Sequence, residues 1–228
     1  MKLIGLLGGT SWPSTIEYYR ILNELTQDKL GGFHSANILL RSIDYHAIKS
    51  CYHDAWNKIP ILLKHEIEAF VQLKPACLVI CNNTLHKAFD VIEPDLGLTI
   101  PVFHSVKVTG RFAQSAHLNR LLLLGTKFTM EDGFYHQGLE AFGLQVSVPS
   151  EEDRSRIQII QSQLAKGIIE PSFKQYFIQL INKHTEVDAV VLACTELPLV
   201  IHANDCKIPV INPTELQCKD AFEFALSE

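Results

Sequence analysis

The sequence predicts an α/β protein made of two similar three-layer α/β/α lobes with parallel sheets. Two observations predict this fold. Short apolar runs alternate with segments of helical periodicity along the chain, which is the pattern of parallel βαβ units. The same order of strand and polar turn also occurs twice. The lobes are therefore expected to be related by internal pseudo-symmetry, with an active site in the cleft between them.

In the first half, each expected strand is a short apolar run. The runs are Leu3–Leu7, Ala36–Leu40 and Cys77–Cys81. The first ends in Gly8-Gly9, and the third ends in two asparagines. Helical periodicity is expected between the strands, beginning near Ser14 and again over Ile61–Leu73.

The second half repeats this order. Strands are expected at Leu121–Leu124, Leu144–Val148 and Ala189–Cys194. Helices are expected at Met130–Phe142, Glu152–Ala165, Phe173–Lys183 and Thr214–Leu226. In parallel sheets both faces are covered, so near-continuous apolar strands of this kind are the expected form.

The two halves also have similar amino-acid sequences at the ends of their expected strands. "LIGLLGGTS" pairs with "RLLLLGTKF", and "LVICNNTLH" pairs with "VVLACTELP". The first pair of turns is 74 residues apart (Gly8 to Asn82) and the second 69 (Gly125 to Cys194). We expect an N-terminal lobe of residues 1–100 plus 211–228 and a C-terminal lobe of residues 101–210, because the last helix is expected to pack back on the first lobe.

Composition excludes several classes of function. The net charge is −5 and no Lys/Arg cluster occurs, so no nucleic-acid partner is expected. No stretch approaches the roughly 18 apolar residues of a membrane span, and the short apolar N-terminus lacks a signal-peptide pattern, so a cytoplasmic protein without a membrane partner is expected. The six cysteines lack zinc-site spacing, so no metal is expected.

Polar residues follow four of the expected strands. In parallel sheets, ligands bind outside the carboxyl ends of the strands. Each polar turn also opens a helix, whose free N–H groups suit a carboxylate. Taken singly, each threonine is better explained as an ordinary helix N-cap, and the symmetric placement in both halves is what favours a binding role. The candidate binding residues are Gly9, Thr10, Asn83, Thr84, Thr126, Thr129 and Thr195.

Cys194 is the candidate nucleophile or base. It ends a strand and precedes a helix start, an environment that exposes a thiolate and lowers the thiol pKa in many enzymes. The alternative is a buried structural cysteine. The polar Thr195-Glu196 that follows fits a cleft better than a core. The other five cysteines are interpreted as structural.

The chain resembles the aspartate/glutamate racemase family over nearly its whole length. The resemblance rests on "IGLLGGTSWPSTIEYYRILNE", "CNNTLH", "LLGTKFTMEDGFY" and "ACTELPL", and is closest to the L-aspartate/glutamate and broad-specificity branch. It implies a cofactor-independent enzyme that does not use pyridoxal phosphate, acts on an amino acid and is often a homodimer. It also implies a two-base mechanism, in which one cysteine from each lobe flanks the substrate Cα.

The first-lobe cysteine is replaced. Aligned on the family pattern Cys-Asn-Thr-x-His, the catalytic position is Asn82, and Cys81 precedes it by one residue. A shift of one residue at a strand end turns a side chain to the other face, so Cys81 is expected to point into the core. An amide is no base at pH 7. The catalytic residues are therefore predicted to be Cys194 and Asn82.

Three functions remain open. The first is a racemase or epimerase for aspartate, glutamate or a related amino acid, with impaired or one-sided proton transfer. The second is a one-cysteine decarboxylase of the arylmalonate type. The third is a non-catalytic homologue that binds an amino acid or dicarboxylate. Substrate side-chain choice is poorly encoded: Arg41 and Lys166 are candidates for reading a distal carboxylate, and His86 and His104 are candidate neighbours of the cleft.

Overall fold

The computed structural model describes residues 1–52 and 54–227. The chain divides into two compact units. Unit 1 is Met1–His104 together with the C-terminal segment that starts at Gln217, and unit 2 is Ser105–Leu216. Each unit has its own sheet and its own core, and each is described by itself.

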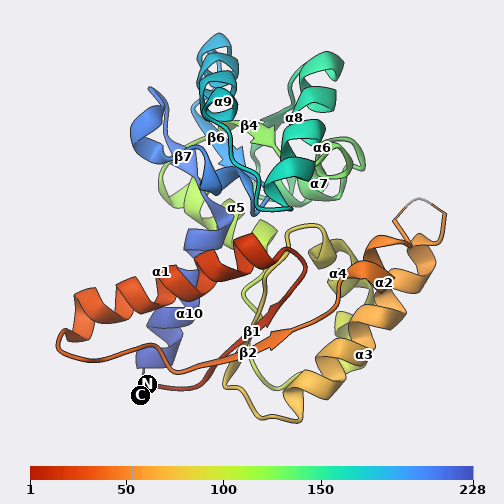
Figure 1. Cartoon of the computed structure of the whole chain (residues 1–228), viewed down its shortest axis with the longest axis vertical. Coiled ribbons are helices and arrows are strands. Elements are labelled where there is room, and N and C mark those ends of the chain that lie inside the picture. The colour runs from red at the N-terminus through yellow and green to blue at the C-terminus, as the bar shows by residue number, and fades with distance from the viewer. Residues whose placement is uncertain (53, 228) are drawn as a thin grey trace. The chain divides into compact units, whose positions relative to one another are not determined.

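Unit 1 contains a parallel three-stranded sheet with the strand order β2-β1-β3. Strands β1 and β2 lie side by side in Figure 1. The strands are β1 (Ile4–Gly8), β2 (Ile38–Ser42) and β3 (Cys77–Ile80). Because all three run in the same direction, their carboxyl ends lie at one edge of the sheet. The turns after β1 and β3 are therefore neighbours.

Helices cover both faces of this sheet. Along β3, alternate residues face opposite sides, as strand geometry requires. Cys77 and Val79 pack with α1 (Trp12–Leu30) and α10 (Pro213–Leu226). Leu78 and Ile80 pack on the other face, with helices α3 (Ile59–Val71) and α4 (Leu85–Leu96). Short helices, α2 (His46–Lys49) and the 3-10 turn η1 (Trp56–Lys58), connect β2 to α3.

Unit 2 contains a parallel four-stranded sheet with the order β5-β4-β6-β7. Its strands are β4 (Arg120–Leu124), β5 (Gln145–Ser147), β6 (Ala189–Leu192) and β7 (Val210–Ile211). On one face lie α5 (Ser105–Ser115) and α7 (Phe134–Glu140). On the other face lie α6 (Lys127–Glu131), α8 (Glu151–Leu164) and α9 (Pro171–Lys183), followed in the chain by the 3-10 turns η2 (Leu197–Leu199) and η3 (Ala203–Asp205).

The two sheets share one pattern of hydrogen bonds. Leu78 N donates to Pro101 O at 2.9 Å in unit 1, and Val190 N donates to Pro209 O at 2.9 Å in unit 2. An isolated parallel bridge between Leu78 and Val102 stands in unit 1 where β7 stands in unit 2. The prediction of two similar three-layer lobes with parallel sheets is confirmed by these units.

Most predicted elements match within two residues, but the helix predicted over Met130–Phe142 is wrong. The chain forms two helices there, α6 and α7, with a break before Phe134. Gly133 at the break has φ +94°, in the left-handed region that interrupts a right-handed helix. A glycine inside a helical pattern is tolerated in many proteins, so the sequence pattern alone did not reveal the break.

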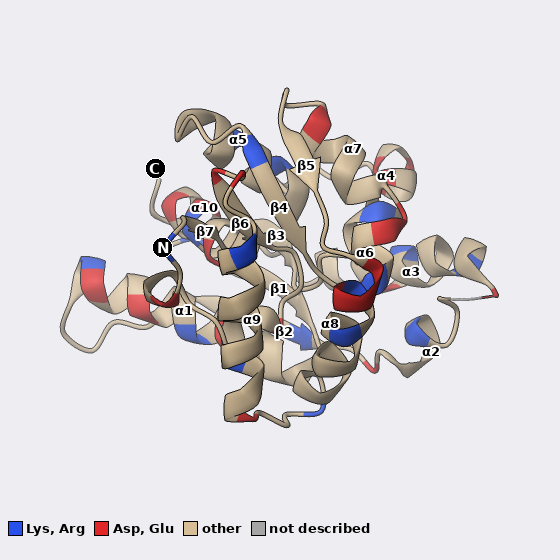
Figure 2. Cartoon of the chain, turned by 90° about the horizontal axis from the view of Figure 1, so that it is seen from above, with Lys and Arg blue, Asp and Glu red and all other residues tan. Residues whose placement is uncertain are grey.

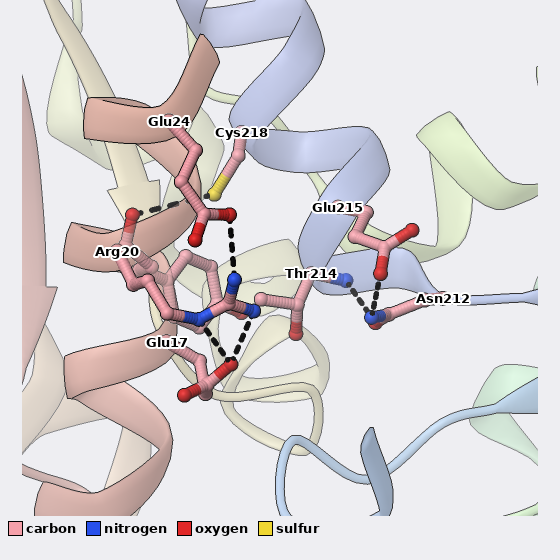
Figure 3. Close-up of polar contacts among 8 residues, drawn as sticks. Glu17, Arg20, Glu24, Asn212, Thr214, Glu215 and Cys218 are labelled. Atoms are coloured by element: carbon pink, nitrogen blue, oxygen red, sulfur yellow. Dashed lines mark hydrogen bonds and ion pairs between the residues drawn. The ribbon is translucent and has the colours of Figure 1, made fainter. Parts of the chain in front are cut away.

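The start of α10 and its packing on α1 are fixed by local polar contacts (Figure 3). Asn212 Oδ1 accepts a hydrogen bond from Thr214 N at 3.1 Å, and Asn212 Nδ2 donates to Glu215 Oε1 at 3.0 Å. Cys218 on α10 directs its Sγ to the backbone carbonyl of Tyr18 on α1, at 3.8 Å. The contacts of Asn212 stabilise the start of the helix at Pro213, and the contact of Cys218 joins α10 to α1, within the apolar cluster that both helices form with β1 and β3.

Charged residues of both signs occur on the same helices, as Figure 2 shows for α1 and α8. On α1, for example, Arg20 pairs with Glu17 at 2.7 Å and with Glu24 at 2.5 Å. Among residues 1–52 and 54–227, no helix has the length and apolar character that a membrane crossing requires.

Candidate active site

The turn after β1 requires glycine at position 9. Gly9 has φ +86°, and a Cβ there would lie 2.3 Å from the carbonyl oxygen of Ile43. Ile43 follows β2, and its N–H donates to Gly8 O at 3.0 Å, which pulls the two chains together. Gly9 N donates to Thr15 Oγ1 at 3.0 Å, so the turn is tied to the first turns of α1. The backbone of the site is thus held close to β2.

Thr10 joins the two polar turns of unit 1. Its hydroxyl donates to the carbonyl oxygen of Cys81 at 3.0 Å, across neighbouring strand ends. The next residue, Ser11, is buried, and its Oγ has no hydrogen-bond partner among the described residues. Ser11 precedes α1 but does not cap it. Sequence reasoning did not select Ser11, because a serine before a helix is usually a cap.

Asn83 is the second buried polar side chain in this half without a partner. It is 3% exposed, and neither atom of its amide has a hydrogen-bond partner in the described part of the chain. A buried polar group left unsatisfied costs about 1–3 kcal/mol. Ser11 and Asn83 belong to turns that Thr10 connects, so their unsatisfied groups mark this edge of the sheet as a place for a polar ligand.

Asn82 and Thr84 behave differently from Asn83. Asn82 is half-buried, and its Oδ1 accepts a hydrogen bond from Leu85 N at 2.9 Å, which satisfies the first free N–H of α4. Thr84 is buried and stands at the N-cap position, but its side chain forms no capping hydrogen bond. Asn82 therefore supplies the cap of α4. An ordinary N-cap was the alternative interpretation of Thr84, and its side chain does not have that role here.

Cys81 belongs to the core. It is fully buried and packs in the cluster that β1 and β3 form with α1 and α10. Burial raises the pKa of its thiol far above the ordinary value, so it stays protonated at neutral pH. This is the inward orientation expected from the shift of one residue.

In unit 2, the turn after β4 is a capped helix start. Thr126 Oγ1 accepts from Thr129 N at 3.1 Å and lies 2.9 Å from Thr129 Oγ1. Gly125 lies close to β6, since a Cβ there would be 3.2 Å from Ala193 O. Thr126 is therefore an N-cap in this structure, with Thr129 beside it and the β6 turn adjacent.

The turn after β6 brings a thiol and a carboxylate together. Cys194 Sγ donates to Glu196 Oε2 at 2.8 Å, and Thr195 Oγ1 donates to the same oxygen at 3.2 Å. Cys194 is 4% exposed and Glu196 5%. Sequence reasoning considered Glu196 only as a polar neighbour. The available signal was a glutamate inside "ACTELPLV", a run that is otherwise almost wholly apolar.

Equivalent hydrogen bonds relate the two strand ends. Cys81 N donates to Leu7 O at 2.9 Å, and Ala193 N donates to Leu124 O at 2.7 Å. One residue further along, the chain has Asn82 in unit 1 and Cys194 in unit 2. The two turns therefore carry chemically different groups at corresponding backbone positions.

Arg41 and Lys166 are the candidates for reading a distal carboxylate. Arg41 on β2 forms an ion pair with Glu66 on α3, with Nε and Nη2 at 2.9 and 2.6 Å from Glu66 Oε2. Lys166 is exposed and follows α8. An ion pair within unit 1 and an exposed position are ordinary structural roles of such cations, so neither observation supports a role in reading a substrate carboxylate.

His86 and His104 are both buried in unit 1, with ring centroids 4.2 Å apart. His104 Nε2 lies 3.1 Å from Asp90 Oδ1. Among the residues with described positions, no group of three His, Cys, Asp or Glu side chains is arranged to hold a metal ion.

The family is decided by comparison with known proteins. The sequence model of the Asp/Glu/hydantoin racemases matches residues 7–221, which is nearly the whole chain. The chain belongs to this family. A crystal structure from Yersinia pestis, named as a candidate Asp/Glu racemase, is 35% identical with a TM-score of 0.86, and each chain covers 100% of the other.

Two further relatives place the chain within this racemase family. A crystal structure of an aspartate racemase homologue from Pyrococcus horikoshii OT3 is 28% identical, with a TM-score of 0.86 and 100% coverage of both chains. A glutamate racemase of Latilactobacillus sakei is 28% identical over 150 residues. That match takes in 65% of this chain and 51% of the relative, so it spans about half the length of that curated protein. The predicted resemblance to aspartate and glutamate racemases is confirmed.

Proposed function

We propose that this protein is a cofactor-independent amino-acid racemase or epimerase that acts on aspartate, glutamate or a related amino acid. One observation carries the proposal. The thiol of Cys194 lies 2.8 Å from the carboxylate of Glu196 in unit 2, and both side chains are buried. A thiol next to a proton acceptor is the arrangement that makes a base strong enough for a carbon acid. Family membership supports the choice of an amino acid as substrate.

The proton transfer uses two groups of the chain. In the resting state, the Cys194 thiol donates its hydrogen bond to Glu196. Transfer of that proton to the carboxylate leaves a thiolate, and the thiolate then removes the proton from the substrate Cα. The electron pair of the broken C–H bond moves onto the α-carboxylate of the substrate. The reverse transfer from the thiol to Cα completes the exchange, and no electron is gained or lost.

The turns of unit 1 are proposed to bind the α-carboxylate. Asn83 Nδ2 and the Ser11 hydroxyl are buried donors without a partner among the described residues. Free N–H groups at the helix starts add to these donors. Donors fixed in this way stabilise the charge that develops on the carboxylate when Cα loses its proton. Thr84 and Thr195 are proposed as further contacts.

Asn82 gives the reaction its expected asymmetry. Inversion needs an acid and a base on opposite faces of Cα, and this proposal assigns one face to Cys194 and the other to the position of Asn82. An amide does not take or give a proton at neutral pH. We therefore expect exchange at Cα to exceed inversion, with a water at Asn82 supplying the minority proton. The equivalent hydrogen bonds of Cys81 and Ala193 support the choice of Asn82 and Cys194 as corresponding positions of the two units.

The test is deuterium wash-in at Cα, followed by NMR in D₂O with L- and D-aspartate and L- and D-glutamate, together with chiral chromatography of the products. We expect exchange that is faster than inversion. Cys194→Ala should abolish both, and Asn82→Cys should raise inversion. No exchange with any member of an amino-acid panel would favour a binding protein. Release of CO₂ from an aryl malonate would favour a decarboxylase instead.

The homodimeric state implied by the family resemblance and the cytoplasmic location expected from the sequence composition remain predictions. Size-exclusion chromatography with light scattering measures the first, because a dimer has twice the chain mass of 25.7 kDa.

A further inference from the structure

Gln217 lies where the chain returns to unit 1. The chain leaves unit 1 after His104 and re-enters it at Gln217, within α10. Gln217 is fully buried, and its Nε2 donates to the backbone carbonyl of Phe103 at 2.6 Å. The side-chain amide of Gln217 therefore joins the segment that leaves unit 1, at Phe103, to the helix that re-enters it.

The same amide contacts both helices that follow the unit 1 site turns. Its Oε1 accepts a hydrogen bond from the Tyr18 hydroxyl on α1 at 2.9 Å. Its Nε2 lies 3.2 Å from His86 Nε2 on α4. Helix α1 follows the turn that holds Ser11, and α4 follows the turn that holds Asn83. Tyr18 and His86 are fully buried, so these contacts are shielded from water.

The direction of each hydrogen bond is determined. A backbone carbonyl only accepts, so the nitrogen of the Gln217 amide must face Phe103 and the oxygen must face Tyr18. The remaining N–H of the amide is directed to His86, whose Nε2 then accepts. His86 is consequently a neutral imidazole with its proton on Nδ1. Turning the amide over would place an oxygen against the Phe103 carbonyl, so the arrangement has one orientation.

We infer that Gln217 is a positioning residue of the candidate active site. It fixes α1 and α4 relative to each other, and with them the two turns proposed to bind the substrate carboxylate. It also fixes both of these turns relative to Phe103, near the point where the chain leaves unit 1, and to α10, where the chain re-enters it. The inference rests on the proposed function, because that proposal gives the turns their role. A displacement of about 1 Å in a reacting geometry can lower a rate about a hundredfold.

The central variant is Gln217→Glu, which has nearly the same shape. Its carboxylate still accepts from Tyr18, but it has no N–H for Phe103 or for His86 Nε2. The matched control is Gln161→Glu, a second buried glutamine, on α8 of unit 2. If Gln217→Glu does not fold, Gln217→Met replaces it, because methionine has a similar length and forms no such hydrogen bonds.

Three measurements are made on the full chain at a temperature where every variant is folded. The ¹⁵N spectrum of His86 reports its tautomer, the amide shifts of residues 9–11 and 82–84 report the turns, and Cα exchange reports activity. We expect native His86 to carry its proton on Nδ1. Gln217→Glu should protonate Nε2, move the amide signals of both turns and lower the exchange rate at least tenfold. Gln161→Glu should leave all three near native.

Each outcome decides one of the two proposals. A native His86 with its proton on Nε2, or unmoved turn signals in the Gln217 variant, overturns the positioning role even if the native protein shows no exchange. Native exchange that survives in Gln217→Glu overturns it as well. Absence of exchange in the native protein, with the expected tautomer and moved turn signals, contradicts the proposed function and leaves the positioning of the turns supported.

Discussion

Glu196→Gln is the sharpest test of the proposed proton transfer. The substitution keeps the size of the side chain and removes its negative charge. The carboxylate oxygen accepts from Cys194 Sγ at 2.8 Å and from Thr195 Oγ1 at 3.2 Å. A glutamine whose amide oxygen takes the place of this carboxylate oxygen can still accept both bonds, but it cannot take the proton of the thiol.

The size of the effect follows from these contacts. A hydrogen bond to a charged group contributes about 1.5–3 kcal/mol. At about 1.36 kcal/mol for each factor of ten, loss of this much stabilisation as the thiol gives up its proton lowers the rate about tenfold to 150-fold. Loss of a general base lowers a rate by about 10²–10⁴-fold. Because Glu196 is proposed to act as the base for the thiol, we expect a decrease of at least about 100-fold at pH 7.

The assay is deuterium wash-in at Cα under saturating amino acid. Glu140→Gln, which removes an exposed carboxylate on α7 of the same unit, is the matched control and should exchange at the native rate. Alkaline pH should partly restore exchange in Glu196→Gln, because hydroxide replaces the carboxylate as the proton acceptor. A folded Glu196→Gln protein that keeps more than a third of the native rate at pH 7 would refute the role of Glu196.

Three further predictions concern stability and the inactive thiol. Gly9→Ala should lower the free energy of unfolding by about 2–4 kcal/mol in urea titrations, because it combines a left-handed φ with a Cβ 2.3 Å from Ile43 O; an unchanged midpoint would contradict the turn geometry. A hydrogen bond from Arg120 lowers the pKa of Asp188 to about 2, so the Asp188 carboxylate stabilises the fold above about pH 4, and this stabilisation is lost as the pH falls toward 2. Asp188→Asn should therefore lower the free energy of unfolding by about 1 kcal/mol at pH 7 and by less at pH 3, as measured in urea titrations. Cys81→Ala should cost about 1–2 kcal/mol of stability but keep the native exchange rate within twofold, and loss of exchange would make Cys81 the base.

The architecture was predictable because buried parallel strands have a simple sequence pattern. The apolar runs at β1, β3, β4 and β6 are buried along almost their whole length. Such a run predicts a strand without any knowledge of the strands that pair with it. The polar turns at the carboxyl ends of the strands were predictable for a similar reason, and the site proposed there stays a prediction. The break at Gly133 was not predictable, because a glycine alone does not end a helix.

The side-chain contacts around the candidate site could not be predicted from the sequence. Whether Arg41 faces a substrate or Glu66 depends on the packing of α3 against β2, and the structure shows the ion pair. Gln217 contacts Tyr18 and His86 across 199 and 131 residues of sequence. No periodicity or motif connects residues at such separations. The unsatisfied amide of Asn83 is likewise a property of its surroundings and not of its neighbours in the chain.

Asn82, at the position where the family resemblance implies a cysteine, serves as a helix cap. Asn82 Oδ1 accepts from Leu85 N at 2.9 Å, and loss of such a cap costs about 0.5–2 kcal/mol. Asn82→Cys should therefore lower the free energy of unfolding by about 1 kcal/mol while it raises inversion at Cα. Asn82→Ala, which loses the cap and gains no thiol, should show the same loss of stability without the gain in inversion. Equal inversion in the two variants would show that the thiol is not the cause, and unchanged stability in both would show that Asn82 does not cap α4. Asn82→Cys should therefore lower stability and raise inversion because the two units repeat the same backbone hydrogen bond at this strand end but use the next side chain differently. In unit 1 that side chain, Asn82, caps a helix, and in unit 2 it is Cys194, which carries the proposed chemistry.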